Sequence, residues 1–322
     1  MENVTKIGKP ETKEITPKKK LKWWKVSLQL VGVGTLIAVG VIGGKYVGRI
    51  IFQRHRDYSK YTVEKQDYSK AYETYEKTSP SMYTTKFNAT ELVNIGLLNI
   101  SKSNEFYAVT RGKVRVDVLG GINQDILQTF IKSGDSYYEE DLSKSSAEKA
   151  GFRFYQTGND EVTVYEASSV SKNGDLLDGD YSKSEPEVLS AEEFAENWGR
   201  ETLSDPIVYH INDQTVIDST VKKENGLIKV GLDLEPILSV LKYVRQMKST
   251  GNLSHYPDFS KVHIDFVLDE NLFVQSFTTD EDYVATSKKF PLPVDSSGTL
   301  TMEYVYSHRD IPTMEEKSNF NK

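Results

Sequence analysis

One pair of side chains in this 322-residue sequence has a type and spacing that could support nucleophilic catalysis. Ser146 and Lys149 form an S-x-x-K pair, which in penicillin-binding-type enzymes supplies the nucleophile and works with S-D-N and K-T-G motifs. Those partner motifs are absent, and so are G-x-S-x-G, H-E-x-x-H and the P-loop. We therefore interpret the pair as chance, and predict that the chain is not an enzyme and needs no cofactor.

A second group of side chains could bind a metal ion. His263 and Asp265 share one face of a predicted strand, with His255 upstream, although a solvated strand face explains this pattern equally well. Two acidic clusters offer carboxylates for Ca²⁺, but neither has the EF-hand spacing of ligands and glycine. We therefore predict no metal site, and solvated loops at the two clusters, which are Asp175, Asp178 and Asp180, and Asp280, Glu281 and Asp282.

Composition excludes several other kinds of site. The chain has no cysteine, which rules out disulfides, thiol catalysis, Cys-ligated zinc and a lipidated cysteine, and which fits a bacterial cell envelope. The net charge is −7, yet residues 1–25 carry eight Lys against three Glu, and residues 45–60 carry five basic residues against one acidic. The remainder is therefore strongly acidic, and a nucleic-acid partner is not expected.

The residues from Val26 to Gly44 form an uncharged, mostly apolar run of nineteen. As a helix it would cover roughly 28 Å, enough to cross a bilayer, and no A-x-A-like cleavage site follows. The sequence thus predicts a single-pass protein of the cell membrane with a cytoplasmic N-terminus and an extracytoplasmic C-terminal domain. Small residues four apart on one face predict close contact with a partner helix or a second copy, with plain anchoring as the alternative; these residues are Gly40, Gly44 and Gly48.

The rest of the chain divides by composition. Tyr68, Tyr72 and Tyr75 share one face of a predicted helix after the membrane segment, which favours packing on the domain or the headgroups, with partner binding as the alternative. The predicted parts are a disordered basic tail at 1–25, a transmembrane signal anchor at 26–52, a juxtamembrane helix and linker at 53–83, an extracytoplasmic half-barrel domain at 84–308 and a flexible C-terminal tail at 309–322.

Within the domain, local signals place helices and strands. Capping boxes at 88–91 and 190–193 each predict the start of a helix, and Pro236 opens a third, amphipathic helix. Asn225-Gly226 predicts a tight hairpin. Alternating apolar residues at 114–118 and 262–268 predict antiparallel meanders. The predicted fold class is α+β: a single transmembrane helix followed by a curved antiparallel half-barrel sheet with two to three helices packed on its concave side.

The stretch from Ile228 to Tyr306 resembles envelope proteins of the LolA and LppX type, especially in VGLDLEPILSVLKYVRQM and FSKVHIDFVLDENLFVQSFTTDEDYVA. Members of that superfamily bind lipid or lipoprotein acyl chains between sheet and helices. The resemblance therefore implies a binding function for an apolar ligand. This chain departs from that superfamily because its domain is predicted to be anchored by a membrane helix, and an anchored domain could not carry a ligand far.

These observations predict a membrane-anchored bacterial envelope protein that binds a lipid, an acyl chain or another envelope component without catalysis. The alternative is a protein-interaction or accessory subunit of a membrane or envelope complex. The same apolar residues could fill a core or line a pocket. The predicted ligand cavity is lined by Leu238, Leu241, Val244, Val262, Ile264, Phe266, Leu268 and Trp198.

Overall fold

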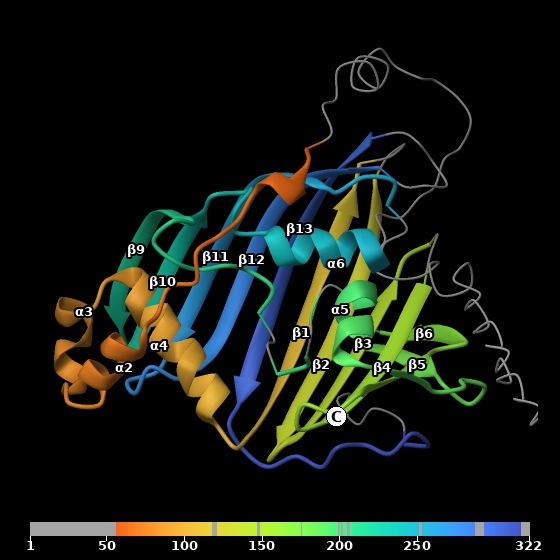
Figure 1. Cartoon of the computed structure of the whole chain (residues 1–322), viewed down its shortest axis with the longest axis horizontal. Coiled ribbons are helices and arrows are strands. Elements are labelled where there is room, and N and C mark those ends of the chain that lie inside the picture. Colours follow the sequence, from red (N-terminus) through yellow and green to blue (C-terminus); the bar gives the residue numbers. More distant parts are fainter. Residues whose placement is uncertain are drawn as a thin grey trace, which may run out of the picture.

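The computed structural model of the chain describes residues 56–117, 121–146, 149–174, 176–198, 200, 202–204, 207–250, 253–286 and 293–316. Its main feature is an eleven-stranded antiparallel sheet in the order β8-β5-β4-β3-β2-β1-β13-β12-β11-β10-β9 (Figure 1). Strands next to one another in sequence mostly pair as meanders, and the first strand, β1, joins the last, β13. One continuous sheet therefore connects both halves of the domain.

The strands are long in the middle of the sheet. Their bounds are β1 Glu105–Val116, β2 Ile122–Ser133, β3 Ser136–Lys144, β4 Lys149–Thr157, β5 Val162–Glu166, β6 Ser169–Asn173, β7 Leu176–Asp180, β8 Glu187–Leu189, β9 Val216–Glu224, β10 Leu227–Leu234, β11 Asp258–Leu268, β12 Val274–Thr286 and β13 Pro293–Val305. The helices are η1 Tyr58–Lys60, α2 Ser69–Tyr75, η2 Pro80–Met82, α3 Tyr83–Lys86, α4 Ala89–Lys102, α5 Ala191–Trp198 and α6 Leu241–Thr250.

Local sequence chemistry explains most of the helix ends. The Asn88 side chain accepts a hydrogen bond from the Glu91 N–H, and the Glu91 carboxylate accepts one from the Asn88 N–H, which completes the predicted capping box of α4. Ser190 and Glu193 make the same exchange before α5. Helix α6 begins later than Pro236, because the Glu235 carboxylate accepts hydrogen bonds from the next N–H groups and holds residues 236–240 in turns.

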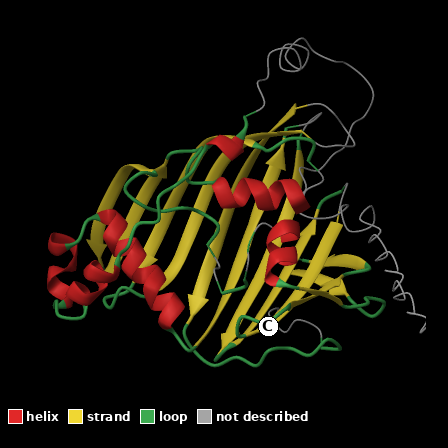
Figure 2. Cartoon of the chain, in the orientation of Figure 1, coloured by secondary structure: helices red, strands yellow, loops and turns green. Residues whose placement is uncertain are grey.

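Helices α4, α5 and α6 all lie against one face of the sheet, which we call the inner face (Figure 2). The main hydrophobic core is there. On the opposite, outer face the small β6–β7 hairpin and the stretch from Ile311 to Met314 pack over a second apolar cluster. The members of this cluster are Val109, Leu127, Ile131, Tyr138, Leu142, Ala167, Val170, Leu177 and Tyr181. Because side chains alternate along a strand, β1, β2 and β3 supply residues to both clusters.

The predicted fold class is wrong. In the part of the chain that the structure describes, one large antiparallel sheet with a few short helices takes the place of the predicted α+β half-barrel. One difference lies in β12, where the sequence predicts a solvated loop at Asp280, Glu281 and Asp282. These residues continue the strand instead: Glu281 points inward and is buried, while Asp280 and Asp282 point outward.

The predicted localisation is contradicted as well. Within the described ranges, which begin at residue 56, no helix is long and apolar enough to cross a membrane. A single-pass topology is therefore not supported. The predicted span at 26–52, with Gly40, Gly44 and Gly48, and the predicted tail at 1–25 lie outside the described residues. The prediction depended on the length of an apolar run, which is a property of the sequence and not of an observed helix.

Candidate ligand-binding site

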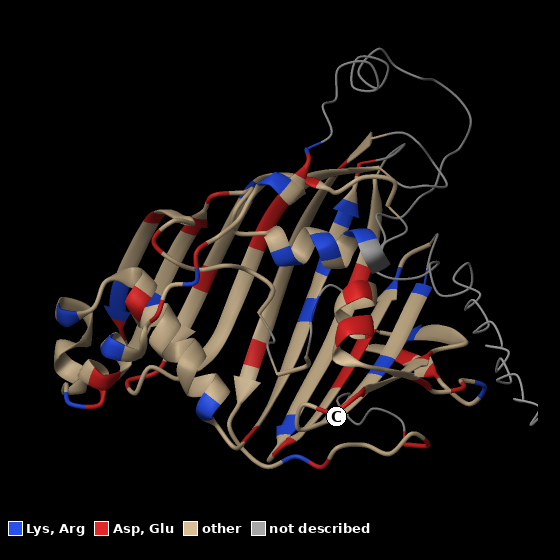
Figure 3. Cartoon of the chain, viewed as in Figure 1, with Lys and Arg blue, Asp and Glu red and all other residues tan. Residues whose placement is uncertain are grey.

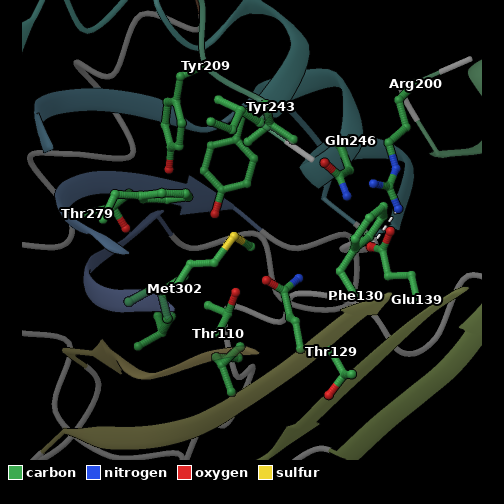
Figure 4. A pocket seen from close by; sticks show the side chains of 17 residues that line it. Thr110, Thr129, Phe130, Glu139, Arg200, Tyr209, Tyr243, Gln246, Thr279 and Met302 are labelled. Carbon is green, nitrogen blue, oxygen red and sulfur yellow. Dashed lines mark hydrogen bonds and ion pairs between the residues drawn. The ribbon is translucent and has the colours of Figure 1, made fainter. Parts of the chain in front are cut away.

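A cavity of about 110 Å³ lies between the inner face of the sheet and helix α6 (Figure 4). Strands β1, β2, β12 and β13 form its floor, while α6 and residues 207–209 face them from the other side. Its walls are mostly apolar. The lining residues are Thr110, Val114, Ile126, Gln128, Thr129, Phe130, Glu139, Arg200, Ile207, Val208, Tyr209, Tyr243, Gln246, Phe277, Thr279, Leu300 and Met302.

Two glycines lie on the inner face next to residues that line this cavity. Gly112 of β1 pairs with Leu300, and Gly298 of β13 pairs with Val114, so two neighbouring inward positions carry no side chain. A Cβ at Gly112 would lie 2.1 Å from the Thr299 carbonyl oxygen, so the backbone there requires glycine. A Cβ at Gly298 would only reach ordinary contact, 3.6 Å from Val114 Cγ2. Gly298 therefore leaves space that a larger side chain could fill.

A charged pair closes the end of the cavity at β3. Arg200, just after α5, donates from its guanidinium to Glu139 Oε1 at 2.6 Å, and both side chains are nearly buried. Asp141 shares the inner face of β3 with Glu139. Burial raises the pKa of the Asp141 carboxyl well above its usual range; the charge of Glu139 adds to this, and Arg200 opposes it. Two carboxyl groups and one guanidinium therefore meet at this end.

A third buried carboxyl group, that of Glu281, lies behind Tyr209 at the other end. The Tyr209 hydroxyl donates to Glu281 of β12, and the Tyr209 ring packs edge-on against Tyr243 of α6 with centroids 5.5 Å apart. Burial raises the pKa of Glu281 to about 7, although the hydrogen bond from Tyr209 acts in the opposite direction. Figure 4 shows both tyrosines facing the sheet residues across the cavity. Glu281 is therefore a carboxyl group that changes charge near neutral pH.

Several polar atoms on the inner face have no hydrogen-bond partner among the described residues. Thr110 lines the cavity, is 4% exposed, and its hydroxyl makes no bond. Glu139 also lines the cavity, and its carboxylate accepts hydrogen bonds from Arg200 and from the Asp141 carboxyl. Leaving a group such as the Thr110 hydroxyl buried and unpaired costs about 1–3 kcal/mol. Two further unpaired atoms on β2 and β3 are Gln124 Oε1 and Ser143 Oγ. The inner face thus offers hydrogen bonds that the described side chains do not use.

The residues predicted to line a cavity lie beside this one, in the core. Six of them are buried in the main hydrophobic core: Val262, Ile264, Phe266 and Leu268 of β11, and Leu241 and Val244 of α6. Trp198 packs edge-on against Phe152 and Phe154, each 4.9 Å away by ring centroids. Leu238 is half-buried in the turn before α6. None of these eight residues lines the cavity, although α6 covers both regions.

The sequence did contain a signal for the actual lining. The alternation around Val114 and Val116 shows which residues of β1 point inward. Thr110 and Gly112 lie four and two residues before Val114, so they are on the same, inner face of the strand. Polar residues and glycines are usually taken as surface or turn positions, so they were not considered for a cavity. The pairing of β1 with β13, which brings Gly298 next to Gly112, has no local signal at all.

The candidate metal ligands do not gather into a site. His263 lies on the outer face between Asp233, 2.6 Å from Nδ1, and Asp265, 3.3 Å from Nε2. Burial lowers the pKa of His263, but the bonds to these two carboxylates outweigh it and leave the pKa raised. His255 Nδ1 is 2.9 Å from Ser254 Oγ. Among the described residues no group of three or more His, Cys, Asp or Glu side chains could hold a metal ion.

The remaining predicted residues are spread over the molecule. Ser146 precedes β4, which Lys149 begins, and the two residues between them lie outside the described residues. Asp178 and Asp180 belong to β7, while Asp175 is not described. Asp280 pairs with Lys261 on the outer face. Figure 3 shows Lys and Arg interspersed with Asp and Glu along the strands of this view.

The tyrosines of α2 pack on the domain. The Tyr72 hydroxyl donates to Asn99 Oδ1 at 2.8 Å, and the Tyr75 hydroxyl donates to the Asn271 carbonyl oxygen at 2.7 Å. Tyr68 lines a surface groove beside α4 and is half-buried. Two of the three side chains therefore hold α2 against α4 and the turn after β11.

Comparisons with known proteins give few matches. No protein-family model matches the chain, and no curated protein matches its sequence. Among solved structures, a domain from Vibrio parahaemolyticus described as an outer membrane lipoprotein-sorting protein is 8% identical, covers 69% of this chain and 96% of its own, and has a TM-score of 0.26. An N-terminal dehydratase from the difficidin assembly line is 10% identical, covers 67% and 82%, and has a TM-score of 0.11.

The first of these structures is of the lipoprotein-sorting kind that the sequence resemblance names. At a TM-score of 0.26 the two chains do not superpose as wholes. The function therefore has to be inferred from the site of this chain.

Proposed function

We propose that this chain is a binding protein that holds one end of an amphipathic, lipid-like molecule in the cavity under α6. The observation that carries the proposal is the mostly apolar cavity between the inner face of the sheet and α6, together with the space that Gly298 leaves beside Val114, one of the lining residues. Apolar walls with a few polar groups at one end are typical of sites for such ligands. The sequence resemblance implies the same class of ligand.

The size of the cavity limits what enters it. Its volume of about 110 Å³ is below the ~150 Å³ of an engineered protein cavity that takes up benzene. A whole acyl chain does not fit. The cavity therefore holds a polar end with the first few methylenes, while the rest of the chain extends out along α6.

Ligand-observed NMR on the full-length chain tests this proposal. A series of 1-butanol, 1-hexanol and 1-octanol should give saturation-transfer signals, and affinity should rise with chain length by up to roughly fourfold per buried methylene. Gly298→Leu should abolish the signals, because its side chain fills the floor beside Val114. Thr299→Leu is the matched control, since Thr299 is the next residue of β13 and is exposed on the outer face.

Equal binding by Gly298→Leu and the parent chain, or the absence of any alcohol binding to the parent chain, would reject the proposal. Affinity that does not change with chain length would limit the ligand to a small polar molecule. Thermal unfolding of both variants shows whether each is folded before its binding is compared.

A further inference from the structure

The charged groups around the cavity are already compensated. Arg200 and Glu139 are the charged residues among the described ones that line it, and they are paired with each other. The Glu139 carboxylate also accepts a hydrogen bond from the Asp141 carboxyl, which keeps its proton because burial raises its pKa well above the usual range. At the other end the Tyr209 hydroxyl donates to Glu281, which does not line the cavity. A charged ligand group would therefore find no free counterion on these walls.

Two hydroxyl groups of the lining have no hydrogen-bond partner among the residues that the structure describes. Thr110 on β1 is 4% exposed, and its hydroxyl makes no hydrogen bond. Tyr243 of α6 faces the sheet from the opposite wall, and Figure 4 shows its hydroxyl pointing away from the helix. Burial raises the pKa of Tyr243 well above its usual range, and the charge of Glu281 adds to this. Both hydroxyls therefore keep one hydrogen to donate and can also accept.

We infer that the buried end of the ligand is uncharged and presents an oxygen atom to the hydroxyl groups of Thr110 and Tyr243. An ammonium or a carboxylate would leave water without gaining a counterion, which is costly between mostly apolar walls. A neutral oxygen loses less on leaving water, and hydrogen bonds from the two hydroxyls compensate that loss. The inference rests on the proposed function and deepens it, because it limits the ligand to fatty alcohols, amides and esters.

The test uses two pairs of ligands that have the same carbon chain and differ in charge: 1-hexanol with n-hexylamine, and hexanamide with hexanoate. The full-length protein is titrated by NMR at about pH 6, where the amine is protonated, the acid is ionised and Glu281 is mostly neutral. The uncharged member of each pair should bind roughly tenfold or more tightly than the charged member. Because one charged ligand is a cation and the other an anion, weak binding of both shows selection against charge of either sign.

Variants show whether the two hydroxyl groups bind the oxygen. Tyr243→Phe and Thr110→Val should each weaken the binding of 1-hexanol by roughly fivefold, as expected for the loss of one hydrogen bond. Neither variant should change the binding of n-pentane, which has no oxygen. Tyr165→Phe is the matched control, because it removes a tyrosine hydroxyl from β5 beside the outer apolar cluster and should change the binding of neither ligand. Thermal unfolding shows that each variant is folded before its binding is compared.

The outcomes separate this inference from the proposed function. If hexylamine or hexanoate binds as tightly as its uncharged counterpart while Gly298→Leu still blocks 1-hexanol, the inference is wrong and the proposed function stands. The inference is also wrong if Tyr243→Phe and Thr110→Val both bind 1-hexanol as the parent chain does. Equal weakening of 1-hexanol and n-pentane by both variants would show that these residues only shape the cavity, which rejects the inference too. If none of the ligands binds, n-pentane included, the proposed function fails with it.

Discussion

Arg153 and Glu140 are directly paired across β4 and β3 on the outer face, with Arg153 Nε 3.0 Å from Glu140 Oε1 and with 1% and 2% of their side chains exposed. The guanidinium also lies 4.3 Å from the centre of the Tyr181 ring and donates to the Met314 carbonyl oxygen at 3.1 Å. One buried ion pair thus joins the sheet, the end of the β6–β7 hairpin and the C-terminal stretch.

Removing one partner of this pair should be more harmful than removing both. Arg153→Met leaves the Glu140 carboxylate buried without its cation, and we expect a loss of about 3–5 kcal/mol in the free energy of unfolding. The double variant Arg153→Met with Glu140→Leu should recover much of that loss, because no uncompensated charge remains. Urea unfolding of the single and double variants measures both values. A double variant as unstable as Arg153→Met would show that the contacts of Arg153 with Tyr181 and Met314 dominate.

Features encoded within a few residues could be predicted from the sequence. The Asn225-Gly226 turn has positive φ at both residues, 53° and 80°, and joins β9 to β10 as expected. The capping boxes of α4 and α5 are also local, because each pairs side chains and backbone groups three residues apart. The antiparallel strands of the second meander follow from period-two alternation in the same way.

Features that depend on distant pairing could not be predicted. Three consecutive acidic residues predict a loop at Glu281, and only the register of β12 with its neighbours shows that this side chain points inward. The cavity needs Thr110 of β1 to lie beside Met302 of β13, although the two residues are far apart in sequence. Spacing along the chain carries no information on either relationship.

The stability of the domain should fall as the pH rises toward neutrality because of Glu281. The pKa of this carboxyl is about 7 in the folded chain and 4.5 ordinarily, so between these values the folded state binds the proton that the unfolded state has released. The stabilisation from the neutral form is complete below about pH 4.5 and is lost above pH 7, a change of about 3 kcal/mol.

Glu281→Gln isolates this effect. The amide keeps an acceptor for the Tyr209 hydroxyl and does not titrate, so the variant should be more stable than the parent chain at pH 8 and lose the advantage toward pH 4.5. Other groups titrate in both proteins, and their effects cancel in the difference. A difference in unfolding free energy that stays constant from pH 4.5 to pH 8 would show that Glu281 is ionised throughout.

Replacing Thr110 by Val should stabilise the ligand-free chain. The Thr110 hydroxyl is buried without a partner, and a methyl group of similar shape removes that penalty, for an expected gain of roughly 1–3 kcal/mol. Thr278→Val is the control, because the Thr278 hydroxyl is 2.9 Å from that of Thr301 and the substitution breaks this bond. Thermal unfolding should therefore shift in opposite directions for the two variants. A loss of stability in Thr110→Val would mean that solvent satisfies the hydroxyl in the free protein.

The lysines of β9 should keep the edge of the sheet from pairing with another chain. β9 ends the strand order, nearly all of its side chains are exposed, and Ile217 and Val221 add apolar surface to it. Charged side chains on an exposed edge oppose strand addition, and Lys222 and Lys223 are the two consecutive cations there.

Replacing both by Thr should cause association that increases with protein concentration in sedimentation velocity. Replacing Lys113 of β1 and Lys183, which follows β7, by Thr changes the net charge equally at exposed positions away from β9, and should leave the protein's sedimentation unchanged. Association of both double variants would attribute the effect to net charge, and association of neither would show that the geometry of β9 protects the edge without its lysines.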